Sequence, residues 1–185
     1  CQCGGMTPVE QPVARAGSAR YVDTEQPGSA MNNAELIVQI LKKAGTTHGF
    51  GIPSGNVLPL MDAMRLHDLP FVLTAHEGSA GFAADVMGRM TGAPGLGIAT
   101  LGPGATNLVT GLADANMDRA PVVAIIGQGS TNRLHKESHQ IMDSISMVQP
   151  ISKWAQTILS PKNVTEVIRK AFKVAETEKP GVTVI

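Results

Sequence analysis

The chain carries, at residues 76–85, the sequence His76-Glu77-Gly78-Ser79-Ala80-Gly81-Phe82-Ala83-Ala84-Asp85, directly after an apolar run at 71–75. The apolar run predicts a buried strand, and the small residues after Glu77 predict a closely packed helix that ends near Met90. One carboxylate therefore lies where a strand ends and a helix begins. Because a buried acid costs free energy unless a partner meets it, we expect the rest of the chain to provide a partner for Glu77.

Strand and helix patterns alternate on both sides of this segment. Strands are predicted at 47–52, 71–75, 96–101, 122–126, 153–158 and 182–185, and helices at 32–44, 57–67, 77–90, up to about 116, 137–148 and from 163 onward. The strands are continuously apolar, which indicates a parallel sheet covered on both faces. The predicted fold class is α/β, a three-layer doubly wound parallel sheet with helices on both faces.

Helix ends are also marked in the sequence. Asn32 with Glu35 forms a capping-box pattern at the start of the first helix, and Gly45 follows its end. Asn163 is expected to cap the last helix, whose apolar residues form one stripe.

Four loops are predicted to share one edge of the sheet. They span residues 51–56, 76–78, 102–107 and 127–132, and each follows a predicted strand. Parallel sheets bind ligands beyond the carboxyl ends of their strands, and three of these loops are rich in glycine, which lets backbone approach a ligand closely. This edge is the predicted binding site.

Several catalytic and binding motifs are excluded. The loop at 102–107 lacks the Gly-Lys-Ser/Thr ending of a phosphate-binding loop and the third glycine of a dinucleotide fingerprint. Position 80 is Ala, where a zinc-protease helix that began at His76-Glu77 would need histidine, and Ser54 lacks the spacing of a nucleophile elbow. We predict no metal site in this chain.

Composition limits the classes of partner. Lys+Arg 15 balances Asp+Glu 15, so nothing draws the chain to nucleic acid or to a membrane surface. Charged residues make up only 16%, which fits surface buried against other chains or domains, although a core rich in Gly and Ala gives the same figure. Residues 1–30 are rich in Gly, Pro, Ser and Ala and are interpreted as a disordered leader or appended sequence. The two cysteines, Cys1 and Cys3, lie there, so no core disulfide can form and a cytoplasmic location is expected.

Two interpretations of Glu77 remain open from the residues alone. It can be a carboxylate that stabilises the N-terminus of its helix. Alternatively, it can be a functional acid, because a carboxyl group shielded from water is suited to proton exchange. The four converging loops favour the second interpretation.

A series of short motifs occurs in order along residues 31–185. It comprises Phe50-Gly51-Ile52-Pro53-Ser54-Gly55, Ala75-His76-Glu77, Ala83-Ala84-Asp85 with Gly88-Arg89, the run from Gly102 to Gly111, Asp118, Pro121, Gly127-Gln128, Ile151-Ser152-Lys153-Trp154 and Lys179-Pro180-Gly181. In this order the motifs resemble the N-terminal, pyrimidine-binding domain of thiamine-diphosphate enzymes. The likeness is greatest to the catalytic subunit of acetolactate (acetohydroxyacid) synthase.

The resemblance implies a role for each matching residue. Glu77 would be catalytic and would hydrogen-bond N1′ of the aminopyrimidine ring, while Pro103, Gly104 and Asn107 would line that ring. Gln140 would lie near cofactor or substrate. Ser54 and Gly55 would approach the reacting carbon of a 2-oxo acid. For Ser54 and Gln140, a plain loop hydrogen bond remains the alternative.

Two departures from the synthase pattern concern the substrate channel. The family usually has Gly at position 54 and Gln at position 78, where this chain has Ser54 and Gly78. It also has Phe-Gln-Glu where this chain has His139-Gln140-Ile141. The acceptor, and the choice among ligation, decarboxylation and oxidation, therefore stay open. Lys153 matches a lysine near the family's channel, with a solvated lysine as the alternative.

The resemblance also implies what lies outside this chain. Family members hold the diphosphate through magnesium on a second domain with a Gly-Asp-Gly motif, and no such motif occurs here. We therefore expect residues 31–185 to be the pyrimidine-binding domain alone, without the middle and diphosphate-binding domains and inactive by itself. FAD stays open as a further cofactor, and a homodimer or higher oligomer is expected.

Three alternatives to a synthase-like fragment stay open. The chain can be a separate pyrimidine-domain subunit of a sulfopyruvate-type decarboxylase. It can be a non-catalytic interaction module with the same fold. A Rossmann-type nucleotide enzyme is the fourth hypothesis, although its fingerprints are incomplete.

Overall fold

The computed structural model describes residues 31–136 and 138–185. The helices of this part are α1 (Asn33–Lys43), α2 (Leu58–Leu66), α3 (Glu77–Thr91), α4 (Pro103–Met117), α5 (Ser144–Val148) and α6 (Val164–Glu176). The strands are β1 (Gly49–Gly51), β2 (Phe71–Leu73), β3 (Gly95–Ala99), β4 (Val122–Ile126), β5 (Trp154–Ala155) and β6 (Val182–Val184). The predicted leader at residues 1–30, with Cys1 and Cys3, lies outside the described residues.

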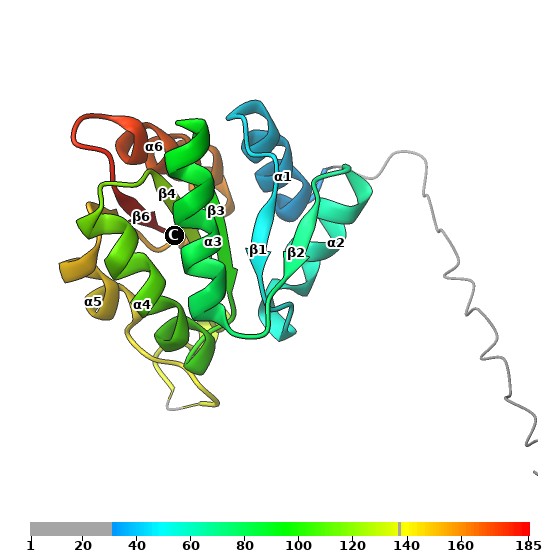
Figure 1. Cartoon of the computed structure of the whole chain (residues 1–185). Coiled ribbons are helices and arrows are strands. Elements are labelled where there is room, and N and C mark those ends of the chain that lie inside the picture. The colour runs from blue at the N-terminus through cyan, green and yellow to red at the C-terminus, as the bar shows by residue number, and fades with distance from the viewer. Residues whose placement is uncertain (1–30, 137) are drawn as a thin grey trace, which may run out of the picture. The chain divides into compact units, whose positions relative to one another are not determined.

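All six strands pair in parallel, in the order β2-β1-β3-β4-β6-β5. Figure 1 labels these strands from β2 to β6 in that order. Strand β1 lies between β2 and β3, so that Gly51 is aligned with Leu73 on one side and Ile98 on the other. The predicted parallel sheet is confirmed.

Helices cover both faces of this sheet. On one face, α1, α2 and α6 bury residues such as Leu41, Met64 and Ile168 against Leu96 and Ile98 of β3. On the other face, α3, α4 and α5 bury small and apolar side chains against β4 and β6. Neighbouring residues of a strand point to opposite faces, so continuously apolar strands are buried on both sides. The predicted three-layer architecture is confirmed.

The prediction of a buried strand before Glu77 is wrong. Strand β2 is the edge strand of the sheet, and the side chain of Leu73 is 67% exposed. Val72 is also exposed, as are Phe82, Val86 and Met90 on the helix that follows. An apolar run does not reveal whether its strand has one neighbour or two, because that depends on the order in which the chain crosses the sheet.

The predicted helix at 137–148 is mostly wrong. Only Ser144–Val148 forms an α-helix, preceded by a 3-10 turn at Thr131–Arg133. Gln140 has φ 60°, a left-handed conformation that a continuous α-helix does not allow. The predicted strand at 153–158 is reduced to two residues, Trp154–Ala155.

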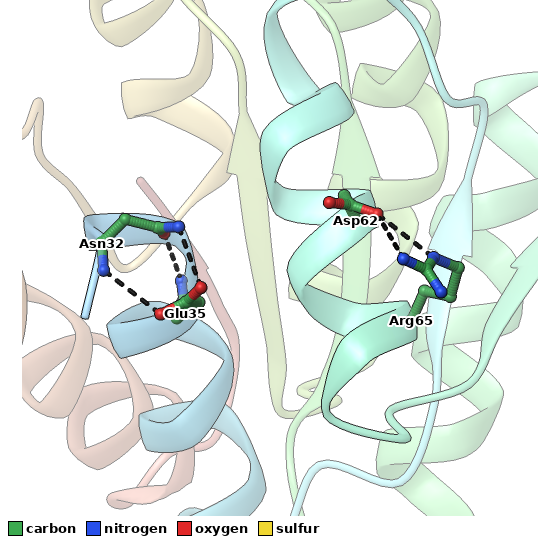
Figure 2. A network of polar contacts seen from close by, with 4 residues as sticks. All are labelled: Asn32, Glu35, Asp62 and Arg65. Carbon is green, nitrogen blue, oxygen red and sulfur yellow. Dashed lines mark hydrogen bonds and ion pairs between the residues drawn. The ribbon is translucent and has the colours of Figure 1, made fainter. Parts of the chain in front are cut away.

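The two predicted asparagine caps differ in the structure. Asn32 accepts a hydrogen bond from the backbone N–H of Glu35 at 2.9 Å, and the Glu35 carboxylate accepts from the backbone N–H of Asn32 at 3.2 Å (Figure 2). The capping box is therefore confirmed. Asn163 precedes α6 but makes no side-chain capping bond, so that prediction is wrong.

This pair of asparagines allows a matched stability test. Asn32→Ala is expected to lower the free energy of unfolding by about 1 kcal/mol, because the backbone N–H of Glu35 loses its side-chain acceptor. Asn163→Ala is expected to change it by less than about 0.5 kcal/mol. Urea denaturation followed by circular dichroism measures both, and equal losses in the two variants would contradict the assignment.

Candidate cofactor site

The candidate site lies where the order in which the chain adds strands to the sheet reverses. The chain runs from β1 to the edge strand β2 and then crosses back over β1 to β3. Loops that leave β1 and β3 at their carboxyl ends therefore diverge, which creates the crevice where doubly wound sheets bind ligands. Glu77, the first residue of α3, follows the carboxyl end of β2, and the start of α4 follows that of β3, so the two segments leave the strands on either side of β1.

Glu77 is buried, with 8% of its surface exposed, and its partner within the chain is Asn107. The Asn107 side-chain amide donates to Glu77 Oε2 at 3.0 Å. Asn107 lies in the second turn of α4, because the segment predicted as a loop at 102–107 is helical from Pro103 onward. That correction matters, since a helix holds Asn107 more rigidly than a loop does.

His76 orients the first turn of α3. Its Nδ1 accepts a hydrogen bond from the backbone N–H of Gly78 at 3.0 Å, so His76 is the side-chain cap of this helix. Sequence reasoning had not assigned His76 a role. Its position directly before a helix that begins with small residues was the available signal.

Gly104 leaves one carboxylate oxygen of Glu77 clear. A Cβ atom at position 104 would lie 3.4 Å from Glu77 Oε1 and 2.8 Å from the Thr100 methyl carbon. Within the described part of the chain, Oε1 accepts no hydrogen bond. Glu77 is thus held through one oxygen and keeps the other free to accept a hydrogen from a bound group. This arrangement fits a proton shared between Oε1 and a ring nitrogen such as that of an aminopyrimidine.

Gln140 packs against Gly102, the residue directly before α4. Gly102 has φ 57°, and a Cβ atom there would lie 2.7 Å from Gln140 Cβ and 2.9 Å from the Gln140 carbonyl oxygen. The exposed Gln140 therefore packs on the residue that precedes Pro103, so two predicted site residues lie near each other. The contact is with Gly102 rather than with Glu77.

Ser54 and Gly55 lie in the exposed loop after β1. The Ser54 hydroxyl makes no capping hydrogen bond, and open space surrounds the position of a Cβ on Gly55. The next residue, Asn56, donates from its side chain to the carbonyl of Gln128 at 2.7 Å, which joins this loop to the loop after β4. Both predicted substrate residues therefore lie at the predicted edge.

Gln128 braces the segment that carries Gln140. Its amide nitrogen donates to the carbonyl of Met142 at 2.9 Å, and its amide oxygen accepts from the N–H of Gly129 at 2.9 Å. In the sequence, Gln128 stands out only as part of the Gly127-Gln128 motif. A polar residue two positions beyond a buried strand was the signal for this role.

Lys153 does not lie at this edge. Its ammonium group donates to the carbonyls of Val174 at 2.5 Å and Thr177 at 2.8 Å, at the C-terminal end of α6. Burial lowers the pKa of Lys153 below its usual value. Its role in the structure is to satisfy the last carbonyls of a helix, so the suggested link to a substrate channel gains no support.

Asp143 has a local structural role. Hydrogen bonds from the hydroxyl and the backbone N–H of Ser146 lower the pKa of Asp143, because they stabilise its charged form. Asp143 thereby caps α5. A cavity of about 630 Å³ lies beside it, lined by residues such as Ile126, Ser144 and Ile185 but by neither Glu77 nor Asn107.

Two further features are absent from residues 31–136 and 138–185. No three His, Cys, Asp or Glu side chains of this part are grouped as metal ligands. None of its helices combines the length and the apolar character needed to cross a membrane.

The contact between Glu77 and Asn107 can be measured by a double-mutant cycle. Asn107→Leu is expected to lower the free energy of unfolding by about 1–3 kcal/mol, because a buried carboxylate loses its donor. The double variant Glu77→Leu/Asn107→Leu is expected to lose less than the two single variants together, with a coupling of about 0.5–3 kcal/mol. Urea denaturation of the four proteins gives the cycle, and additive losses would rule out the contact.

Known proteins resemble the chain over the same residues. The family model described as "Thiamine pyrophosphate enzyme, N-terminal TPP binding domain" matches residues 31–147. A protein named probable acetolactate synthase large subunit, from Methanocaldococcus jannaschii, is 41% identical over 82% of this chain and 26% of its own length. Acetolactate synthase from Bacillus subtilis is 38% identical over 85% of this chain and 28% of its own. The large subunit of acetolactate synthase from Corynebacterium glutamicum is 40% identical over 82% of this chain and 24% of its own length.

The chain thus spans about a quarter of the length of the curated relatives it matches. Both the family model and these relatives include the segment that contains Glu77 and Asn107. The sheet, the helix that begins at Glu77 and the matched residues agree: this chain belongs to the thiamine pyrophosphate enzymes and contains their N-terminal thiamine-pyrophosphate-binding domain.

Proposed function

We propose that residues 31–185 form the pyrimidine-binding domain of an acetolactate-synthase-like enzyme that decarboxylates a 2-oxo acid and joins the remaining fragment to an acceptor. The observation that carries this proposal is the carboxylate of Glu77, held by Asn107 at 3.0 Å with its second oxygen free. Membership of the family and the names of the relatives support it.

Glu77 is the proposed catalytic acid. Its Oε1 would share one proton with ring nitrogen N1′ of the aminopyrimidine, donating it as a carboxylic acid and accepting the hydrogen bond once the ring nitrogen carries it. Thiamine diphosphate, when bound, would supply a thiazolium carbon that can lose its proton and so add to the carbonyl of a 2-oxo acid. The donor of Asn107 keeps the carboxylate in one orientation, and the low exposure of Glu77 limits competition from water.

The other predicted site residues have roles in binding. Pro103 and Gly104, in the first turn of α4, would line the pyrimidine ring, and the missing side chain of Gly104 leaves room for it. Gln140 would contact cofactor or substrate from its position over Gly102. Ser54 and Gly55, exposed after β1, would approach the substrate.

The proposed enzyme needs groups that these residues do not supply. We infer that magnesium and the diphosphate bind to a diphosphate-binding domain on another segment or another chain. The exposed apolar residues of β2 and α3, among them Leu73, Phe82 and Val86, are proposed to pack against that domain or a second subunit. Binding of FAD is tested by flavin absorbance of the purified assembly.

The test combines this chain with a diphosphate-binding domain, thiamine diphosphate, magnesium and pyruvate. Carbon dioxide release together with acetolactate formation is the expected result. Carbon dioxide release without acetolactate would favour the decarboxylase subunit. Failure to bind the cofactor in any such assembly would overturn the proposal and favour an interaction module.

A further inference from the structure

A groove of about 610 Å³ lies between α1 and α6, on the face of the sheet opposite α3 and α4. Leu36 and Ile40 of α1 and Phe172 of α6 supply its apolar lining. Phe172 is buried, whereas Leu36 and Ile40 are only partly covered by this chain. The groove is therefore an apolar surface that the domain leaves incompletely covered.

The two helices present regular stripes to the groove. The lining residues recur every three or four positions in both helices, at 36, 40, 43 and 44 and at 165, 169, 172, 173 and 176. This spacing is that of one face of an α-helix. Both helices precede a strand of the same parallel sheet, so they run in the same direction. A third helix can pack lengthwise into the groove between two such helices.

The polar edge of the groove is predominantly basic. Lys43 of α1 and Arg169 and Lys173 of α6 line it, with Glu176 as the one acidic lining residue. The ion pairs within the described part of the chain involve Arg65 and Arg89, and none of these three cations.

Helix stability explains the positions of Lys43 and Lys173 but not that of Arg169. Lys43 and Lys173 lie in the last turns of their helices, where the helix dipole favours cations. Arg169 lies in the middle of α6, four residues before Lys173, and like charges at this spacing destabilise a helix. An anionic partner that shares the groove would relieve this repulsion.

We propose that the groove between α1 and α6 binds an amphipathic helix of a partner protein, with an apolar stripe flanked by acidic residues. The apolar stripe would cover Leu36 and Ile40, and the acidic residues would face Lys43, Arg169 and Lys173. Helix-in-groove recognition uses anchors at such spacing, and the complementary charges select the partner and its orientation. The inference does not depend on the role proposed for Glu77.

The test uses a labelled synthetic helical peptide with leucines at i, i+3, i+4 and i+7 and glutamates beside them. A matched peptide carries lysine in place of each glutamate. Fluorescence anisotropy with the 185-residue chain is expected to give at least about tenfold tighter binding of the acidic peptide. The double variant Arg169→Glu/Lys173→Glu is expected to weaken that binding by at least about tenfold.

Controls separate this site from general charge attraction. Arg133→Glu/Lys162→Glu makes the same change in net charge outside the groove and is expected to leave the affinity within about twofold. Leu36→Ala is expected to weaken binding of the peptide but not of inorganic phosphate. Circular dichroism melting confirms that each variant is folded.

Three outcomes would overturn the inference. They are absence of peptide binding, equal binding of the acidic and basic peptides, and unchanged affinity in Arg169→Glu/Lys173→Glu. Displacement of the peptide by inorganic phosphate, with no effect of Leu36→Ala, would identify a small-anion site and also overturn it.

Discussion

Glu77→Gln is expected to slow carbon dioxide release from a 2-oxo acid by roughly 10²- to 10⁴-fold in an assembly of this chain with a diphosphate-binding domain. Glutamine keeps the size of the side chain and an oxygen that can accept from Asn107. It loses the negative charge that a proton-holding group needs. The measurement is the single-turnover rate at saturating cofactor, because that rate separates the chemical step from binding.

The control for this variant is Glu166→Gln, which changes an exposed glutamate of α6 on the other face of the sheet. It is expected to leave the rate unchanged. The melting temperature of Glu77→Gln distinguishes loss of chemistry from loss of folding. An unchanged rate in a folded, cofactor-bound Glu77→Gln protein would remove Glu77 from the mechanism and leave the helix N-terminal interpretation.

Gly95→Ala is expected to lower the free energy of unfolding by more than about 3 kcal/mol. A Cβ atom at position 95 would overlap the carbonyl oxygen of Ala84 and lie 2.7 Å from the Ala84 carbonyl carbon. These atoms belong to the backbone of α3, so a rotamer change cannot relieve the overlap. Helix α3, which begins with Glu77, would have to move away from the sheet.

Gly97, two residues along the same strand, provides the matched control. The nearest atom to a Cβ there is Leu108 Cδ1 at 3.8 Å, an ordinary van der Waals contact. Gly97→Ala is expected to change the unfolding free energy by no more than about 1 kcal/mol. Alanine lowers the conformational entropy of the unfolded chain, and this stabilisation partly offsets any strain in the folded state. Urea denaturation of both variants gives the comparison. Equal midpoints would show that α3 does not pack on β3 as closely as described.

The sequence correctly predicted those helices and strands whose signals lie within a few neighbouring residues. The capping box of Asn32 and Glu35 spans one helical turn, and it forms as predicted. The apolar run at 122–126 coincides with β4. The helix that begins at Glu77 is predicted to end near Met90, and it ends at Thr91, where Gly92 takes a left-handed conformation with φ 73°.

Long-range packing overrode local signals elsewhere. The segment at 137–148 contains enough helix-forming residues to predict a helix, yet Gln140 packs on Gly102, and this contact requires a different backbone. Asn163 has the residue type of a cap, but a 3-10 turn at Pro161–Asn163 leads into α6 instead. Both errors arise because a residue's preference is weak compared with the packing of the elements around it.

The sequence by itself determined the alternation of strands and helices, the parallel sheet and the resemblance carried by Glu77 and the run from Gly102 to Gly111. These depend on composition and on spacing along the chain. Only the tertiary structure decided that β2 is an exposed edge strand and that Asn107 is the partner of Glu77. The two residues are 30 positions apart, so their contact depends on how α3 and α4 leave the sheet, which no local pattern encodes.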